Sequence, residues 1–237
     1  LPHGLHHQAV IDSMEAGAHV LCEKPLGVTI RACRLMAEAA DRTGKVLSTA
    51  VPQRRLPGER KAHWLINKSG LLGRPLSFFH QYTRPPRKRP AGAEMPPAMA
   101  WRVDRMMSGG GPVMDSGFHY CDSMRYFYGD VATVYAQLRE LSSGAPKGLS
   151  EAREDTVFVT FEFESGVVGN WSWSLAAPGE SIRNVLFYGS EGSLKDTTDS
   201  NYSIFHLFWS EPRIELVGDG LVTLSDGSVM NFAALED

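Results

Sequence analysis

The first 51 residues alternate between helical and strand patterns, and this order constrains the fold more than any other feature of the chain. Residues 2–17 and 29–44 have apolar residues at helical spacing and end at a glycine, whereas residues 19–22 and 46–51 are short apolar runs. A helix, a strand, a helix and a strand joined by short connections are typical of βαβ units. The pattern therefore predicts a parallel sheet with helices on both of its faces.

The second of these helices has a recognisable start and an expected buried face. Thr29 is a residue type that caps helix N-termini, so the helix is expected to begin directly after it. Its apolar positions at helical spacing are Ile30, Cys33, Ala37 and Ala40. We therefore expect this set to face the sheet.

After residue 52 the pattern changes, which predicts a boundary between residues 1–52 and residues 53–237. Helices are expected over residues 59–68 and 114–128, and strands over residues 76–82, 133–141, 155–164, 167–174 and 182–188. The dipeptide Ser165-Gly166 between two of the strands is typical of a hairpin turn. The predicted fold is therefore an α/β segment followed by an α+β domain, whose open, mostly antiparallel sheet carries helices on one face.

Charge and composition exclude several classes of protein. The net charge of −3 gives no overall attraction to nucleic acid or to anionic membranes, and no apolar run approaches the roughly 20 residues that cross a bilayer. Three cysteines in a chain of this length predict no disulfide framework, so a reducing, cytoplasmic location is the default expectation. The chain begins at Leu1 with what reads as the interior of a domain, so we expect an excerpt of a longer protein.

The first candidate functional residue is Lys24, in the sequence Glu23-Lys24-Pro25 directly after the first strand. In open parallel sheets, ligands bind beyond the carboxyl ends of the strands. Lys24 therefore lies where a substrate is expected, and Pro25, whose peptide bond could be cis, would stiffen the turn that aims it. The alternative is a surface lysine in an ordinary loop.

The second candidate is the helix that follows the glycine run at residues 109–111. Asp115, His119 and Asp122 are spaced to share one helical face, and Asp115 could hydrogen-bond His119 one turn later. An imidazole oriented in this way can accept a proton from a substrate hydroxyl. Two alternatives stay open: Asp115 could simply favour the helix N-terminus, or the three side chains could bind a divalent metal ion.

Two further segments bear on ligand binding. Trp101-Arg102 could stack on a sugar ring and pair with a phosphate or carboxylate, or it could only anchor a loop. The proline-rich basic run at residues 84–89 is expected to be a solvated loop rather than a nucleic-acid site. No G-x-G-x-x-G sequence follows a strand, so this chain does not contain the usual pyrophosphate-binding turn.

Two motifs together resemble the Gfo/Idh/MocA oxidoreductase family, named after glucose–fructose oxidoreductase and inositol dehydrogenase. The first is Pro2-x3-His6 followed by Gly17-Ala18-His19-Val20-Leu21-Cys22-Glu23-Lys24-Pro25-Leu26. The second is Trp101-Arg102 followed by Gly109-Gly110-Gly111-x3-Asp115-x-Gly117-x-His119-x2-Asp122. The resemblance is sharp over residues 1 to about 130 and vague beyond them.

This resemblance implies a Rossmann domain that binds NAD or NADP, of which residues 1–52 would be the C-terminal part. The glycine fingerprint and the acidic ribose-binding residue would lie upstream. It implies that Lys24 orients the substrate and that Asp115 and His119 are the catalytic pair, with His119 as the general base. The residues implied to lie near the cofactor are His6, Glu23, Lys24, Pro25, Trp101 and Arg102.

The expected activity is hydride transfer between NAD(P) and a hydroxyl or carbonyl of a sugar, polyol or cyclitol. The resemblance also implies a dimer or tetramer built through the C-terminal sheet, with no resident metal. A non-catalytic sugar or nucleotide sensor of the same fold remains an alternative. The second alternative is a metal-dependent lyase or hydrolase that uses Asp115, His119 and Asp122.

Overall fold

The computed structural model describes residues 1–55, 57–86, 96–111, 113–141 and 154–196, together with the short segments 214–215, 221–223 and 229–231. The chain forms two compact units. The first comprises residues 1–51 with the described parts of 88–118 and 143–155, and the second comprises 52–87, 119–142 and 156–237. The segment around Trp101 and the glycine run belongs to the first unit. The domain boundary predicted between residues 52 and 53 stays a prediction.

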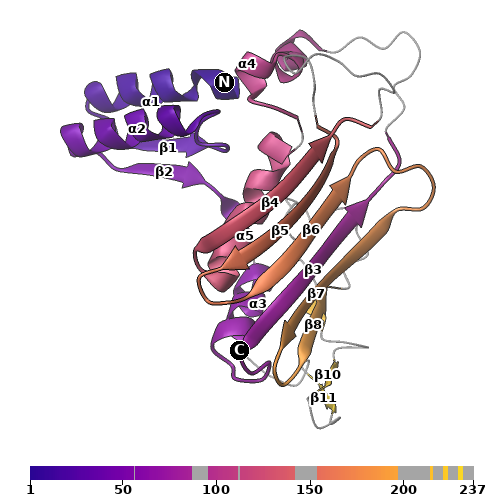
Figure 1. Ribbon diagram of the computed structural model, residues 1–237. Coiled ribbons are helices and arrows are strands. Elements are labelled where there is room, and N and C mark those ends of the chain that lie inside the picture. The colour runs from indigo at the N-terminus through magenta and orange to yellow at the C-terminus, as the bar shows by residue number, and fades with distance from the viewer. Residues whose placement is uncertain are drawn as a thin grey trace. The chain divides into compact units, whose positions relative to one another are not determined.

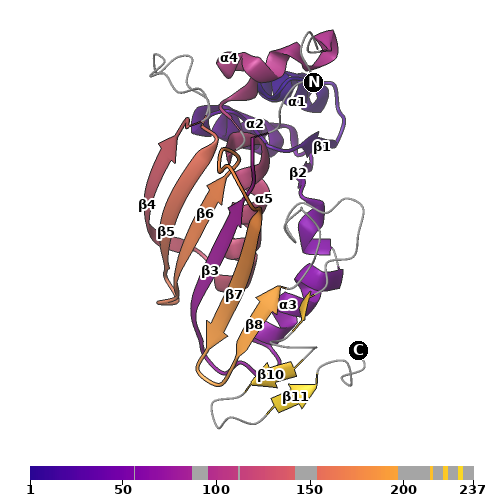
Figure 2. The same ribbon diagram turned by 90° about the vertical axis from the view of Figure 1, so that its right-hand side faces the viewer.

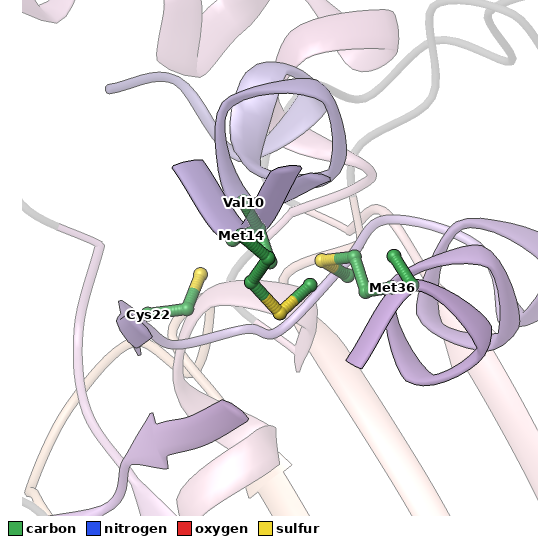
Figure 3. Packing of buried hydrophobic residues seen from close by; sticks show 5 residues of the cluster. Val10, Met14, Cys22 and Met36 are labelled. Carbon is green, nitrogen blue, oxygen red and sulfur yellow. The ribbon is translucent and has the colours of Figure 1, made fainter. Parts of the chain in front are cut away.

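The first unit contains the βαβ unit that the sequence predicts. It begins with a 3₁₀ turn at His3–Leu5 and continues through α1 (His6–Glu15), β1 (Val20–Glu23), α2 (Ile30–Thr43) and β2 (Leu47–Ala50). Strands β1 and β2 pair in parallel, with Val20 opposite Leu47. Figure 3 shows how Val10 and Met14 of α1, Cys22 of β1 and Met36 of α2 gather in one buried cluster.

The prediction that helices cover both faces of the parallel sheet is wrong for the described residues. Both α1 and α2 lie on the same face of β1 and β2 (Figure 1), which is the face on which Cys22 is buried. Successive residues of a strand point to opposite faces, so Leu21 points the other way and is 72% exposed. On the opposite face of this small sheet, Leu21 is therefore open to solvent.

Helix α2 starts where the sequence places it, and its buried face includes only part of the expected apolar set. The Thr29 hydroxyl accepts a hydrogen bond from the amide of Ala32 at 3.1 Å, and Gly44 ends the helix in the left-handed region at φ 66°. The buried residues are Ala32, Met36 and Ala39, and Cys33 and Ala40 of the expected set pack partly buried against the same cluster. Ile30 is 74% exposed. The alanines alone cannot set the helix rotation, so the large side chain of Met36 decides which face packs on α1.

The remaining elements of the first unit are short. They are a 3₁₀ helix at Pro97–Val103, α4 (Arg105–Ser108) and a π-helical turn at Val113–Gly117. The Asp104 carboxylate accepts from the Met106 amide at 2.8 Å and so caps α4. The sequence suggests neither α4 nor the π-helical turn, because both are shorter than one clear period of a hydrophobic pattern.

The second unit is built on a seven-stranded sheet. Its elements are a 3₁₀ turn at Pro52–Arg55, α3 (Pro57–Asn67), β3 (Pro75–Thr83), α5 (Phe118–Tyr128), β4 (Val131–Arg139), β5 (Thr156–Phe163), β6 (Val168–Ser174), β7 (Ile182–Gly189), β8 (Ser193–Asp196) and β9 (Ile214–Glu215). The strand order is β4-β5-β6-β3-β7-β8-β9, and all pairs are antiparallel except β3 with β6. The hairpin predicted at Ser165-Gly166 joins β5 and β6, with Gly166 at φ 81°. A separate antiparallel pair consists of β10 (Leu221–Thr223) and β11 (Val229–Asn231).

One face of this sheet carries an aromatic core covered by helices. Figures 1 and 2 show α3 and α5 on the same face, as the sequence predicts. The Tyr120 ring of α5 stacks on Trp171 of β6 with centroids 4.4 Å apart, and Tyr128 stacks on Phe78 of β3 at 5.4 Å. These large rings hold α5 in place and therefore fix the position of its first turn.

The helix that the sequence places at residues 114–128 is in fact two structures. Residues 113–117 form the π-helical turn, and α5 runs from Phe118 to Tyr128. A π-helical turn has more residues per turn than an α-helix, so it breaks the three-and-four spacing between Asp115 and His119. Only His119 and Asp122 are thus placed on one face by regular α-helical geometry.

The helices of the described ranges are all short. The longest, α2, has 14 residues. None of them is long and apolar enough to cross a bilayer, which takes about 20 residues. Cys22, Cys33 and Cys121 are free thiols.

Candidate functional site

Lys24 lies directly beyond the carboxyl end of β1, as the motif predicts. The Lys24–Pro25 peptide bond is cis. The Pro25 carbonyl accepts a hydrogen bond from Nδ1 of His6 at 2.9 Å, and His6 is 5% exposed. His6 therefore contacts the loop that carries Lys24.

The Lys24 ammonium binds Asp115, 91 residues later in the chain. Its Nζ donates to the Asp115 carboxylate Oδ1 at 3.0 Å and to the main-chain oxygen of the same residue at 2.6 Å. Nη1 of Arg102 donates to the other carboxylate oxygen, Oδ2, at 2.7 Å. One carboxylate thus joins two of the cations that the sequence singled out.

This arrangement keeps Asp115 in its charged form. Burial alone would raise the pKa of the Asp115 carboxyl, but the charges and hydrogen bonds of Lys24 and Arg102 outweigh burial and hold that pKa below its usual range. The Arg102 guanidinium also lies over the ring of Trp101, 4.7 Å from its centroid. Trp101 and Arg102 therefore act together to present a cation to Asp115.

The glycine run has a packing reason that the sequence does not reveal. A side chain at Gly111 would place its Cβ 2.4 Å from the main-chain oxygen of Glu154, so only glycine fits there. The Glu154 carboxylate accepts from the amides of Gly111 and Val113 at 2.9 and 3.0 Å. Glu154 thereby anchors the backbone that leads into the turn carrying Asp115.

His3 is a member of the cluster that sequence reasoning did not select. In the structure His3 is 5% exposed, and its Nε2 lies 3.7 Å from Asp115 Oδ1. The usable signal was the spacing of His3 and His6, three residues apart at the start of a helix and so on one side of it.

Glu23 is the exposed member of the motif. Its carboxylate accepts from the amide of Lys24 at 3.2 Å. This hydrogen bond leaves the second carboxylate oxygen of Glu23 able to accept from a ligand, because each carboxylate has two acceptor oxygens.

The two remaining candidates lie on α5. His119 occupies its first turn and is 2% exposed. Both carboxylate oxygens of Asp122 accept from Arg54, Oδ2 from Nε at 2.6 Å and Oδ1 from Nη2 at 2.7 Å. The hydrogen bond that the sequence predicts between His119 and the Asp115 carboxylate stays a prediction.

These pairings count against the metal-dependent alternative. Asp115 and Asp122 each already hold an arginine, and a metal ion would have to displace those guanidinium groups. Across the described ranges, no group of three or more histidine, cysteine, aspartate or glutamate residues is arranged to hold a metal ion.

Comparison with known proteins gives consistent matches to both halves of the chain. Residues 60–195 match the family described as "GFO/IDH/MocA C-terminal domain", and residues 1–51 match "Oxidoreductase family, NAD-binding Rossmann fold". The chain is 32% identical over 196 residues to 1,5-anhydro-D-fructose reductase of Ensifer adhaerens, covering 80% of this chain and 53% of that protein. It is 30% identical over 212 residues to levoglucosan dehydrogenase of Pseudarthrobacter phenanthrenivorans, covering 81% and 53%.

A solved structure agrees with these matches. The fold is similar to that of a levoglucosan dehydrogenase in complex with NADH and L-sorbose, with a TM-score of 0.68 and 30% identity over 83% of this chain and 52% of the other. The chain spans about half the length of the curated relatives it matches. Because the match to the C-terminal domain alone covers more than half of its residues, the chain belongs to the Gfo/Idh/MocA oxidoreductase family.

Proposed function

We propose that the protein catalyses reversible hydride transfer between NAD(P) and a hydroxyl-bearing carbon of a sugar, polyol or cyclitol. The observation that carries the proposal is the contact between Lys24 and the Asp115 carboxylate at the carboxyl end of β1. The names of the relatives support the substrate class, since they are a reductase of an anhydrosugar and a dehydrogenase of another.

The hydrogen-bond arrangement suggests what Lys24 does. An ammonium group has three donors, and two of those of Lys24 go to Oδ1 and the main-chain oxygen of Asp115. The third donor can bind a substrate oxygen and stabilise the negative charge that develops on it during oxidation. Asp115 and Arg102 orient the amine, and His119 is proposed as the proton acceptor for the substrate hydroxyl, as the resemblance implies.

The residues at the end of β1 fit the nicotinamide end of the cofactor. The exposed Glu23 carboxylate can accept from the amide group of a nicotinamide, which has two N–H donors. Pro25, His6, Trp101 and Arg102 would shape the surrounding surface. When bound, NAD(P) supplies the hydride acceptor or donor. The 237 residues contain no glycine fingerprint for the pyrophosphate of this cofactor.

The proposal is tested by mixing the intact protein with NAD⁺ or NADP⁺ and a panel of anhydrosugars, aldoses and cyclitols. We expect at least one substrate to produce reduced nicotinamide, and we expect EDTA to leave that rate unchanged. A folded protein that binds a sugar in calorimetry but reduces neither cofactor with any member of the panel would instead be a sensor. A rate abolished by EDTA and restored by a divalent metal ion would favour the lyase or hydrolase alternative.

We also propose that the protein is a homo-oligomer that associates through the sheet face opposite α3 and α5. That face carries exposed aromatic residues: Phe79, Tyr135 and Phe158 are 50%, 66% and 50% exposed. Strand register places Tyr135 and Phe158 on one face, because Tyr135 pairs with Thr160, two residues from Phe158. Large exposed apolar groups gathered on one face are typical of a protein interface.

A Phe158→Glu variant is expected to dissociate the oligomer, because a charge placed on an apolar interface loses water without gaining a partner. We expect the dissociation constant, measured by sedimentation equilibrium, to rise at least about tenfold, corresponding to about 1.4 kcal/mol. The control is Ile30→Glu, which alters an equally apolar residue that is 74% exposed in the first unit. A wild-type monomer, or an oligomer unaffected by Phe158→Glu, would rule out this interface.

A further inference from the structure

One carboxylate oxygen of Asp115 lies close to two basic side chains. Oδ1 accepts from the Lys24 ammonium at 3.0 Å, and Nε2 of His3 lies 3.7 Å from the same atom. His3 is 5% exposed, and its ring packs edge-on against Trp101 with centroids 4.6 Å apart. The distance between His3 and Asp115 is longer than an ordinary hydrogen bond but within reach of a small movement of either side chain.

The other ring nitrogen of His3 determines which protonation state is present. Nδ1 lies 3.0 Å from the main-chain oxygen of Ser108. A carbonyl oxygen can only accept, so Nδ1 must carry a hydrogen for this hydrogen bond to form. The neutral imidazole then presents the lone pair of Nε2 to the negatively charged oxygen of Asp115, which is a contact between two acceptors. Only a proton on Nε2 converts it into an ion pair.

We propose that His3 is a proton-responsive positioning residue for the Lys24–Asp115 pair. When Nε2 takes a proton from solvent, it becomes a second cationic donor to Asp115 Oδ1 and competes with Lys24 for that oxygen. The Lys24 amine then keeps its hydrogen bond to the main-chain oxygen of Asp115, but its weakened contact with Oδ1 shifts it from the orientation that substrate binding requires. This role rests on the proposed dehydrogenase function, in which Lys24 contacts the substrate.

The groups around His3 determine the pH at which its protonation changes. Burial lowers the pKa of His3 below its ordinary value, and the nearby His6 and Lys24 lower it further. The Ser108 carbonyl and the Asp115 carboxylate act in the opposite direction and do not fully compensate. Arg102 holds the second oxygen of Asp115, so the carboxylate cannot simply rotate away from His3. His3 is therefore neutral at neutral pH and gains its proton on the acid side.

The first test uses nitrogen-15 NMR of the histidine rings in the intact protein without substrate or cofactor, so it does not depend on the proposed activity. We expect the signal that disappears in His3→Gln to show a neutral form protonated at Nδ1. Its titration midpoint should fall in Asp115→Asn, which removes a negative neighbour, and rise in Lys24→Met, which removes a positive one. A neutral form protonated at Nε2, or a midpoint that neither variant moves, would overturn the proposal.

The second test is the pH profile of kcat/KM for whichever substrate the panel identifies. Wild-type activity should fall on the acid side with a limiting slope of about two, one proton for the general base and one for His3. The slope should be about one in His3→Gln, whatever the height of its plateau. A purely structural role would lower the whole profile and keep the slope.

The control for both tests is His19→Gln. His19 is exposed directly before β1, and its Nδ1 accepts from the amide of Val46 at 2.9 Å. This variant should keep the wild-type slope and the wild-type His3 midpoint. A wild-type slope of about one, equal to that of His3→Gln, would contradict the proposal. Failure of every panel substrate would count against the proposed function, while the NMR test still decides the protonation chemistry of His3.

Discussion

A Lys24→Met variant of the intact protein is expected to lose about 10²–10³-fold in kcat/KM for its best substrate, the cost of removing one preorganised donor from a developing oxyanion. Methionine keeps much of the length and apolar stem of lysine but has no ammonium group. The variant therefore loses the donor to the substrate oxygen while its backbone and packing stay close to those of the wild type. The loss should appear mainly in kcat if the interaction strengthens in the transition state.

The matched control is Lys68→Met, which removes an exposed lysine just beyond α3. It should keep wild-type kcat/KM. Lys24→Met should remain folded, because Arg102 still neutralises Asp115 through Oδ2, and a melting curve checks this. A folded Lys24→Met protein with wild-type turnover would remove the central residue of the proposed function.

The largest expected effect on stability comes from Phe78→Ala, which should lower the free energy of unfolding by about 3–5 kcal/mol. Phe78 is 1% exposed, and its ring contacts those of Tyr128 and Phe163. It also covers Gly169 on the neighbouring strand, where the Cβ of any larger residue would lie 2.0 Å from the ring. Truncating this ring leaves a cavity at the centre of the sheet that no neighbour can fill without breaking other aromatic contacts. Urea unfolding measures the loss.

The control for this experiment is the next residue in the chain. Phe79 has the same side chain but points to the opposite face of β3 and is 50% exposed. Phe79→Ala should change the unfolding free energy by no more than about 1 kcal/mol when measured at a concentration where the protein is monomeric. Equal losses for the two variants would contradict the assignment of the inner and outer faces of the sheet.

Local sequence patterns predicted the order of helices and strands and the position of Lys24 at the end of β1. A four-residue apolar run between two helical patterns leaves few alternatives to a parallel strand, and Glu23-Lys24-Pro25 must follow its end. Thr29 and Gly44 marked the ends of α2 because capping depends on one or two neighbouring residues. The strand and hairpin assignments of the second unit were confirmed for the same reason, since alternation and turn residues act over short distances.

Packing details were predicted less well where several patterns compete. The expected buried face of α2 was only partly right, since Cys33 and Ala40 pack against the cluster but Ile30 is exposed. The surface of this helix offers many small apolar residues, and the packing against α1 centres on Met36. The regular helix expected through Asp115 became a π-helical turn, whose spacing no hydrophobic pattern reveals. The expectation of two covered faces failed because a pattern of elements does not state on which side each helix packs.

The sequence by itself determined which chemical groups the site contains: an amine after a strand, a carboxylate after a glycine run, and an imidazole early in a helix. Only the tertiary structure decided which side chains contact the same atom. Lys24 and His3 approach the same oxygen of Asp115, and Glu154 holds the backbone beside it, although these residues are far apart in the chain. The physical reason is that periodicity and capping act between neighbours, whereas a hydrogen bond across 91 residues depends on the path of the whole intervening chain.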